Sequence, residues 1–242
     1  MKEHATHRVI FLDGREISYE WIRKKVKNIN LRVRADGTVS VSSPRGVSQK
    51  QIEMFLTEKA NFLFRALDAF ERRKKTAIPP PTFREGDKIY LFGEEKTLCF
   101  FPVKDGEVQE KDGFLSLPFE ENPEKIKQKL QKYAQKQLLE LLFSYAKRVH
   151  SLFPETVKFP KIKLRAMRAT WGNCRPKEGI LTFNSRLACY PPSCIEYIVM
   201  HEFTHFLIPN HSTAFYAMLS EKMPDWQERK TRLNTCQIQP FF

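Results

Sequence analysis

The sequence has no long hydrophobic run and no targeting segment. No apolar stretch approaches the ~20 residues that a membrane-spanning helix needs, and the charged start MKEHATHR lacks the apolar core of a signal peptide. Internal repeats and low-complexity tracts are absent as well. With 41% hydrophobic and 29% charged residues, the composition is that of an ordinary globular protein. We therefore expect a cytoplasmic protein without a membrane partner.

Cysteine is sparse and unpatterned. The five cysteines are an odd number, and no two of them form a C-x-x-C pair. A disulfide framework, a zinc ribbon and a C-x-x-C redox motif are therefore not indicated. Reduced thiols in a reducing compartment are the expected state.

Acidic residues are much fewer than basic residues, so the chain has a large positive net charge. Lys and Arg number 41 against 28 Asp and Glu, for a formal net charge of +13. Such a charge attracts polyanions through long-range electrostatics and counterion release. Nucleotides, nucleic acids and acidic proteins therefore stay open as partners. The basic clusters lie on expected helix faces or strand ends, where solvated charge is an equally good explanation: Arg23–Lys27, Arg72–Lys75 and Lys125–Lys136.

Residues 1–76 predict a β-rich module with its own helix. Asp13-Gly14 and Asp36-Gly37 each lie between alternating apolar residues, which is the strongest short-range signal for a β-hairpin. From Ser48 onward, apolar residues follow helical spacing. The sequence predicts a single helix over residues 48–74.

The remaining chain predicts an α+β architecture. Residues 77–121 combine a stiff connector around Pro79-Pro80-Pro81 with further strands. The triproline marks one candidate join, and the middle strands could equally extend the first sheet. Residues 122–242 form the last module, in which a long helix backs a small sheet and a second helix lies under the edge of that sheet. Its expected elements are a helix over Glu124–Leu152, strands over Lys161–Arg168 and Gly179–Leu187, and a helix after Pro191-Pro192.

The segment YIVMHEFTHFLIPNH has the pattern of a catalytic metal site. His201 and His205 are four apart, so both imidazoles project from one face of a helix and can bind one ion. Glu202 lies beside them, where a carboxylate can take a proton from a water that the ion activates. Pro209 ends or kinks the helix and returns the chain, so that His211 offers a third nitrogen. Three protein ligands are typical of catalytic zinc, and a trio of structural histidines is the alternative.

Residues upstream of this segment are candidates for meeting the substrate. Metallopeptidase clefts commonly pair an extended substrate with an edge strand, and Arg168–Cys174 is the expected edge. There Gly172 permits close backbone approach, Trp171 offers a wall and Asn173 a polar tip. An ordinary turn with a core tryptophan is the alternative reading.

Three further polar residues are weaker candidates. Asn184 and Arg186 alternate on one face of an expected strand, where either could meet an anion or orient a metal ligand. A solvated strand face would explain them as well. Asn210, beside the third histidine, could cap the helix end or support the metal from its second shell.

The C-terminal part resembles the YgjP-like metal-dependent hydrolases, relatives of the SprT- and WLM-type metallopeptidases. The resemblance is carried by WGNC, LTFNSRL, HEFTH, the following NHS and the closing PDW, and the early DGTVSVSSP hairpin extends it over most of the chain. It implies a zincin-like catalytic module in residues 122–242, with a peptide or protein substrate. It also implies that His201, His205 and His211 are Zn²⁺ ligands, and that Glu202 is the base or acid.

Four positions depart from the family pattern. Ala169-Thr170 replaces the usual Thr-Arg before Trp171, Asn173 stands for serine, and Ser185 stands for tryptophan. A substrate-orienting charge at Thr170 is then missing, or it is supplied by Arg168.

The residues leave several functions open. The first is a zinc metallopeptidase, alone or as a nucleic-acid-associated protein-processing enzyme. The second is a metal-dependent hydrolase of a phosphoanhydride such as a nucleotide, which the net charge and Arg186 would favour. The third is a nucleic-acid-binding module in which the metal serves folding. A structural site would use four protein ligands and would not need Glu202, so the third is the weakest.

Overall fold

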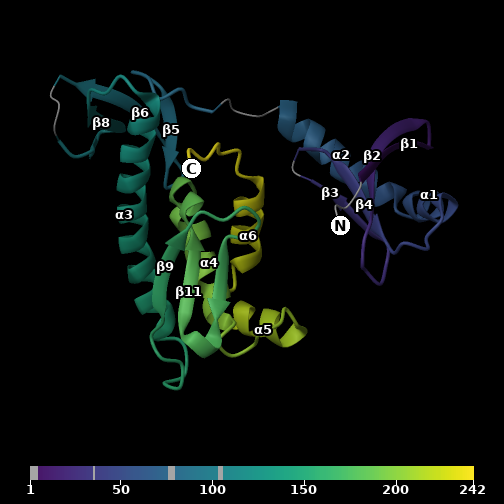
Figure 1. Cartoon of the computed structure of the whole chain (residues 1–242). Helices are drawn as coiled ribbons and strands as arrows, with labels where there is room; N and C mark the ends of the chain where they lie inside the picture. Colours follow the sequence, from purple (N-terminus) through teal and green to yellow (C-terminus); the bar gives the residue numbers. More distant parts are fainter. Residues whose placement is uncertain (1–4, 35, 76–79, 103–105) are drawn as a thin grey trace. The chain divides into compact units, whose positions relative to one another are not determined.

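The computed structural model describes residues 5–34, 36–75, 80–102 and 106–242 (Figure 1). The chain divides into two compact units, Met1–Ala77 and Ile78–Phe242, and each has its own hydrophobic core. Over the described residues, no helix is long and apolar enough to cross a membrane. The predicted α+β class is confirmed.

The first unit is built on a four-stranded sheet in the order β1-β2-β4-β3. Both expected hairpins are present, since β1 pairs antiparallel with β2 and β3 with β4. Asp13 and Gly14 both take positive φ, 46° and 77°, as a two-residue hairpin turn of this hand requires. The strand bounds are Ala5–Leu12 (β1), Arg15–Arg23 (β2), Asn30–Val33 (β3) and Val39–Ser43 (β4).

Two helices supply the rest of the core of this unit. The predicted single helix is wrong in one respect, because it is divided into α1 (Gln49–Glu58) and α2 (Ala60–Lys75). Lys59 leaves helical geometry at φ −98° and ψ 10°, and α2 begins directly after it. Ser48 caps α1 in a capping box with Gln51. Apolar residues of β1, β2, β4, α1 and α2 form the core, Trp21 and Leu56 among them.

The middle strands form a separate sheet and do not extend the first one. This sheet has the order β5-β6-β8-β7, with β6 and β8 parallel. Its buried residues, such as Leu98 and Leu117, are continuous with the core of the second unit. The predicted connector lies partly outside the described residues, at 77–79. The strand bounds are Lys88–Leu91 (β5), Glu94–Phe101 (β6), Gln109–Lys111 (β7) and Phe114–Pro118 (β8).

A long helix and a three-stranded sheet form the frame of the second unit. The helix α3 (Pro123–His150) begins at an Asn122 cap, with proline in its first turn. It runs beside β9 (Figure 1). The sheet has the order β10-β11-β9, with β10 (Gly172–Arg175) at an edge, and is completed by β9 (Lys161–Arg165) and β11 (Ile180–Asn184). The strand β10 lies within the segment that the sequence predicted to link two longer strands.

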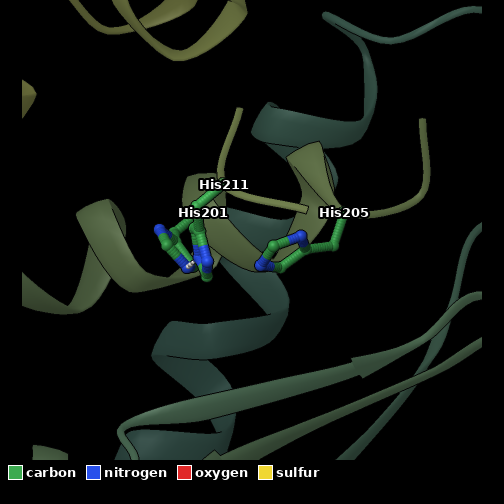
Figure 2. A group of neighbouring side chains, drawn as sticks. All are labelled: His201, His205 and His211. Atoms are coloured by element: carbon green, nitrogen blue, oxygen red, sulfur yellow. Dashed lines mark hydrogen bonds between the residues drawn. The ribbon is translucent and has the colours of Figure 1, made fainter. Parts of the chain in front are cut away.

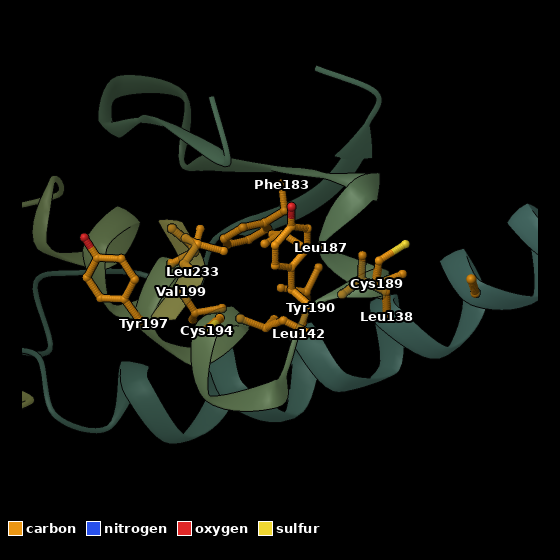
Figure 3. Close-up of a cluster of buried hydrophobic side chains, with 14 of the residues drawn as sticks. Leu138, Leu142, Phe183, Leu187, Cys189, Tyr190, Cys194, Tyr197, Val199 and Leu233 are labelled. Atoms are coloured by element: carbon orange, nitrogen blue, oxygen red, sulfur yellow. The ribbon is translucent and has the colours of Figure 1, made fainter. Parts of the chain in front are cut away.

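Three helices complete the unit: α4 (Pro192–Thr204), α5 (Thr213–Lys222) and α6 (Trp226–Thr235). Figure 3 shows how the core joins them to the frame: Leu142 of α3 lies beside Cys194 of α4, and Leu233 of α6 lies beside Val199 of α4 in the same cluster. The helix α4 is therefore held by α3, α6 and the sheet edge β10. A rigid, buried helix is a suitable support for side chains that must keep a fixed geometry.

Candidate metal centre

The helix α4 is buried along most of its length. Pro192 occupies its first turn, where the missing N–H needs no partner, and Val199 and Phe203 are fully buried. After Thr204 the chain leaves the helix through a tight turn, and Pro209 follows. Of the two predicted alternatives, a helix end or a kink before this proline, the structure has the helix end, at Thr204. The turn after Thr204 directs the chain back toward the face of α4.

Three histidine rings converge beside the end of α4 (Figure 2). His201 comes from α4, His205 caps its C-terminus, and His211 comes from the segment before α5. Their candidate ligand atoms lie within 4.8 Å of one another, and Nε2 of His201 is 3.0 Å from Nε2 of His211. Two nitrogens on one tetrahedral zinc ion at 2.0–2.1 Å are about 3.3 Å apart. The three rings therefore have the spacing that one metal ion requires.

The protonation of the histidines also suits a metal. Nδ1 of His205 donates to the carbonyl of Ile208 at 3.0 Å, which leaves Nε2 with its lone pair. Burial lowers the pKa of His205. Burial, and then the nearby His205, His211 and Lys230, lower the pKa of His201 to about 3. Nδ1 of His201 is buried, with no hydrogen-bond partner among the described residues. Both rings are thus neutral near pH 7, as a metal ligand must be.

Phe215 of α5 forms an apolar floor under the triad. Its side chain is 0% exposed. The centre of its ring lies 4.9 Å from the ring of His201, 4.7 Å from that of His205 and 4.9 Å from that of His211. One phenyl group therefore packs against all three rings and limits their rotation. It also keeps water from that side of the site.

Glu202 is packed tightly against the edge strand. A Cβ atom on Gly172 would lie 2.5 Å from Oε1 of Glu202 and 2.6 Å from its Cγ, so only glycine leaves room for this carboxylate. Glu202 is 5% exposed, and burial raises its pKa to about 8. Burial, and then the carboxyl of Glu202, raise the pKa of Cys174 to about 12. Cys174 does not belong to the group of side chains whose ligand atoms converge on one point, which is the histidine triad alone among the described residues.

A pocket of about 500 Å³ opens over these groups. One wall is the edge strand β10 with Thr170 and Trp171 before it, a second is α4, and a third is α6. Its lining includes all three histidines and Glu202. The pocket therefore joins a metal-binding triad, a buried carboxylate and a sheet edge, which are the parts that a metal-dependent hydrolysis of peptides needs.

A model of the YgjP-like metallopeptidase domain matches residues 27–236. The chain belongs to the YgjP-like family. The match spans the whole metal centre and most of the first unit. The protein is accordingly a metallopeptidase, a hydrolase of peptide bonds in proteins, and its metal ion belongs at the histidine triad. The family expected from the sequence is confirmed.

Two solved structures are similar to part of this YgjP-like metallopeptidase. The metallopeptidase zymogen of Pyrococcus abyssi abylysin is 20% identical with a TM-score of 0.33, over 40% of this chain and 92% of that chain. The metallopeptidase zymogen of Methanocaldococcus jannaschii jannalysin is 17% identical with a TM-score of 0.32, over 40% of this chain and 87% of that chain. No curated protein matches the chain.

Trp171, Gly172 and Asn173, which we expected near the substrate, all line the pocket of the YgjP-like domain. Trp171 packs edge-on against Tyr190, with ring centres 4.7 Å apart, and Asn173 is exposed. The tryptophan is thus a wall of the pocket that is anchored in the core. Binding of substrate by these three residues stays a prediction.

Asn184 and Arg186 do not share a strand face. The strand β11 ends at Asn184, and Arg186 lies in the short 3-10 turn that follows, Ser185–Cys189. Asn184 is 3% exposed. Its Oδ1 accepts from the N–H groups of Met167 and Arg186, and its Nδ2 donates to the carbonyls of Met167 and Thr170. With all these bonds made inside the protein, Asn184 orders the loop before β10, while neither residue lines the pocket.

Asn210 is exposed and forms no hydrogen bond to a described residue. No contact in the described part of the chain therefore supports the predicted role of Asn210, either as a helix cap or as a support for a metal ligand. Arg168, expected to replace a charge at Thr170, does not line the pocket, although Thr170 does.

The residues that the sequence did not reveal come from α6 and α5. Lys230 and Asn234 line the pocket from α6. Lys230 is held with its Nζ 5.6 Å from the ring centre of Trp226 and 5.9 Å from that of Tyr216. The PDW element, which ends at Trp226, was part of the family resemblance. In the structure the ring of Trp226 packs against Lys230 and so supports it at the pocket wall.

Proposed function

We propose that the protein is a zinc metallopeptidase in which His201, His205 and His211 hold the ion and Glu202 moves the proton. The observation that carries this proposal is the meeting of the triad with a buried carboxylate in one open pocket. Three imidazole nitrogens with room for a fourth ligand are the usual donor set of catalytic zinc. Bound zinc would supply a Lewis acid and lower the pKa of a water to about 7.

Glu202 is suited to carry a proton between the water and the leaving amine. In the metal-free chain burial raises the pKa of its carboxyl to about 8. A bound cation would lower this pKa toward the working pH, where a carboxyl both accepts and gives up protons readily. Gly172 and the packing of α4 restrict its position. A carboxylate held in one place beside the reacting atoms lowers the entropic part of the barrier.

The free edge of β10 is suited to bind the substrate as an added strand. The carbonyl of Trp171 accepts from the N–H of Asn184 at 2.9 Å. Because hydrogen-bonded pairs alternate in an antiparallel ladder, the backbone groups of Gly172 and Cys174 then point to the open side. An extended peptide could bond to these groups along the pocket wall. Lys230 would face the negative charge that develops on the peptide, or a carboxylate of the substrate.

The phosphoanhydride alternative has no support from the site. Arg186, which would have assisted it, lies outside the pocket, and among the described residues Lys230 is the one Lys or Arg that lines it. A purely structural metal is disfavoured as well, because the triad lies open to a pocket while structural zinc sites are closed by a fourth protein ligand. All five cysteines are free thiols, which supports our proposal of a reducing compartment, the cytoplasm.

The test compares the wild-type protein with Glu202→Gln, which keeps the size of the side chain and removes the titrating group. Both are purified with their metal content measured and are assayed on an unfolded protein and on nucleoside triphosphates. We expect equal zinc content, cleavage of the unfolded protein by the wild type, and a loss of more than about 100-fold in the variant. Hydrolysis of triphosphates that disappears in Glu202→Gln, with no cleavage of protein, would contradict the proposal. So would unchanged zinc affinity in His211→Ala.

A further inference from the structure

The positive charge of the chain is concentrated on the first unit. Residues 1–77 contain 17 Lys and Arg against 9 Asp and Glu, a net charge of +8, while residues 78–242 contain 24 against 19, a net charge of +5. The unit without the metal centre, about a third of the chain, thus carries more than half of the excess. The attraction to polyanions that the total charge implies should therefore act mainly there.

Part of this charge lines a groove on one face of the first sheet. The groove, of about 360 Å³, runs over β2, β4 and β3, and its cations are Lys24, Arg32 and Arg34. Arg34 lies 3.4 Å from a carboxylate oxygen of Glu20. Lys24 and Arg32 form no ion pair with any described residue. Two cations are thus available to an incoming anion without breaking an internal pair.

Polar groups that suit phosphate lie between these cations. Ser40 and Ser42 of β4 line the groove together with Asn30 of β3. The register places them side by side, since Ser40 pairs with Arg32 and Ser42 pairs with Asn30. Hydroxyl and amide groups beside Arg and Lys are the usual donors to phosphate oxygens.

The same face of the sheet exposes an aromatic ring. Residues paired across strands share a face, and the pairs Ser18–Val9 and Glu16–Phe11 place β1 on the face that also holds Ser40. There Phe11 is 70% exposed and Val9 is 51% exposed. The opposite face packs on α1 and α2 through the core of the unit. The outer face therefore offers cations at one edge and an exposed phenyl ring at the other, with Glu16 and the Arg34-paired Glu20 on β2 between them.

We propose that this outer face binds single-stranded nucleic acid. The phosphates would lie along the groove of Lys24, Arg32 and Arg34, and a base would stack on Phe11. A single strand satisfies both features, because it presents phosphates and free base faces together. An acidic polypeptide would match the cations alone, and the bases of a duplex are not free to stack on a side chain. This site goes beyond the peptidase function and does not depend on it.

The salt dependence of nucleic-acid binding makes the proposal quantitative. Contacts of the two unpaired cations with a single strand predict a slope of log K against log salt of about −1.4, since each contributes about −0.7. Stacking on one aromatic ring is expected to strengthen binding by about 5-fold or more. The two contributions can be removed separately by mutation.

The experiment uses the full chain and a fluorescein-labelled 20-nucleotide oligothymidylate, with binding followed by fluorescence anisotropy from 50 to 200 mM salt. Lys24→Glu/Arg32→Glu is compared with Lys50→Glu/Arg65→Glu, which makes the same charge change on α1 and α2 of the same unit. We expect a loss of at least about 10-fold for the groove pair and less than about 3-fold for the helix pair. Phe11→Ser should weaken binding about 5-fold, and all variants should keep wild-type peptidase activity.

Several outcomes would overturn the proposal. Equal losses in the two double variants would mean that only the bulk charge acts. Equally tight binding of a duplex, or competition by poly-glutamate as strong as that by the oligonucleotide, would assign the face to another partner. Failure of the wild-type protein to bind the oligonucleotide at 100 mM salt would also contradict the proposal. If the charge-reversed pair is less stable by circular dichroism, Lys24→Gln/Arg32→Gln replaces it, with an expected loss of at least about 3-fold.

Discussion

Replacing Gly172 by alanine tests whether the position of Glu202 controls catalysis. The new Cβ would lie 2.5 Å from Oε1, 2.6 Å from Cγ and 2.7 Å from Cδ of Glu202. Ordinary contacts between such atoms are about 3.5 Å or longer, so one of the two groups must move by about 1 Å. The backbone next to Gly172 is held by the hydrogen bond from the N–H of Asn184 to the carbonyl of Trp171, while the carboxyl is the end of a flexible side chain. We expect Glu202 to move.

The displacement sets the size of the effect. A shift of about 1 Å in a reacting group can lower the rate by about 100-fold, so we expect kcat/KM of Gly172→Ala to fall by about two orders of magnitude. Crowding in a packed interior should lower the free energy of unfolding by about 1–3 kcal/mol. The three atoms nearest to the new methyl group all belong to Glu202. Metal affinity should therefore stay within a few-fold of the wild-type value.

The assay measures kcat/KM on an unfolded protein, and metal affinity by competition with a chromophoric chelator. Gly46→Ala is the matched control, since no atom lies within 4 Å of its future Cβ, and it should leave both quantities unchanged. In the Glu202→Gln background, Gly172→Ala should have little further effect on the rate, because the displaced group is already inactive. The reasoning is refuted if Gly172→Ala keeps kcat/KM within about 3-fold of wild type while Glu202→Gln is inactive.

Four further predictions concern other parts of the second unit. Phe215→Leu should weaken metal affinity, measured by chelator competition, about 10-fold, because the Phe215 ring contacts all three histidines. Unchanged affinity would show that Phe215 does not help to position the metal ligands. Asn184→Ala should lower the free energy of unfolding in urea by about 2–3 kcal/mol and reduce kcat/KM with metal affinity intact, whereas loss of metal would place it in the metal shell. Lys230→Met should reduce kcat/KM about 10-fold with metal retained, and a wild-type rate would exclude the lysine from substrate binding. Burial raises the pKa of Asp87, but hydrogen bonds led by the N–H of Arg84 outweigh it and hold the pKa below its usual range. A lowered folded pKa adds stability that is present above about pH 4 and lost as pH falls through the folded pKa. Asp87→Asn should therefore lower Tm at pH 7 but not at about pH 2.5, and an equal loss at both would contradict this account.

The metal ligands could be predicted because their geometry is local. A four-residue spacing places His201 and His205 on one helix face whatever surrounds the helix, and Pro209 ends that helix within a few residues. The return of His211 needs only the short turn after Thr204. The hairpins of the first unit were predictable for the same reason, since Asp13 and Gly14 fix the turn by their own backbone preferences.

Predictions failed where distant parts of the chain decide the structure. Asn184 has the alternation of a strand residue, yet the strand ends there. Its Oδ1 caps the following 3-10 helix by accepting from the N–H of Arg186, and its Nδ2 donates to the carbonyls of Met167 and Thr170. No local pattern reveals those partners, 17 and 14 residues away. Lys230 lies 29 positions after His201 in the sequence and reaches the pocket only because α6 packs on α4. Packing of whole helices is set by the core, and a single sequence does not encode it in any spacing.

The site has two functional parts that share the helix α4, which carries both His201 and Glu202. The triad depends on the end of α4, the turn after it and the floor supplied by Phe215 of α5. Glu202 is restricted by Gly172 of β10, and Lys230 of α6 completes the pocket wall. Because Phe215 packs on the histidine rings while the atoms nearest to a Cβ on Gly172 all belong to Glu202, we expect changes at these two positions to act nearly independently. Phe215→Leu should therefore weaken metal binding by the same factor in the wild type and in Gly172→Ala. A strong departure from that equality would show that the metal and Glu202 are held by one coupled structure.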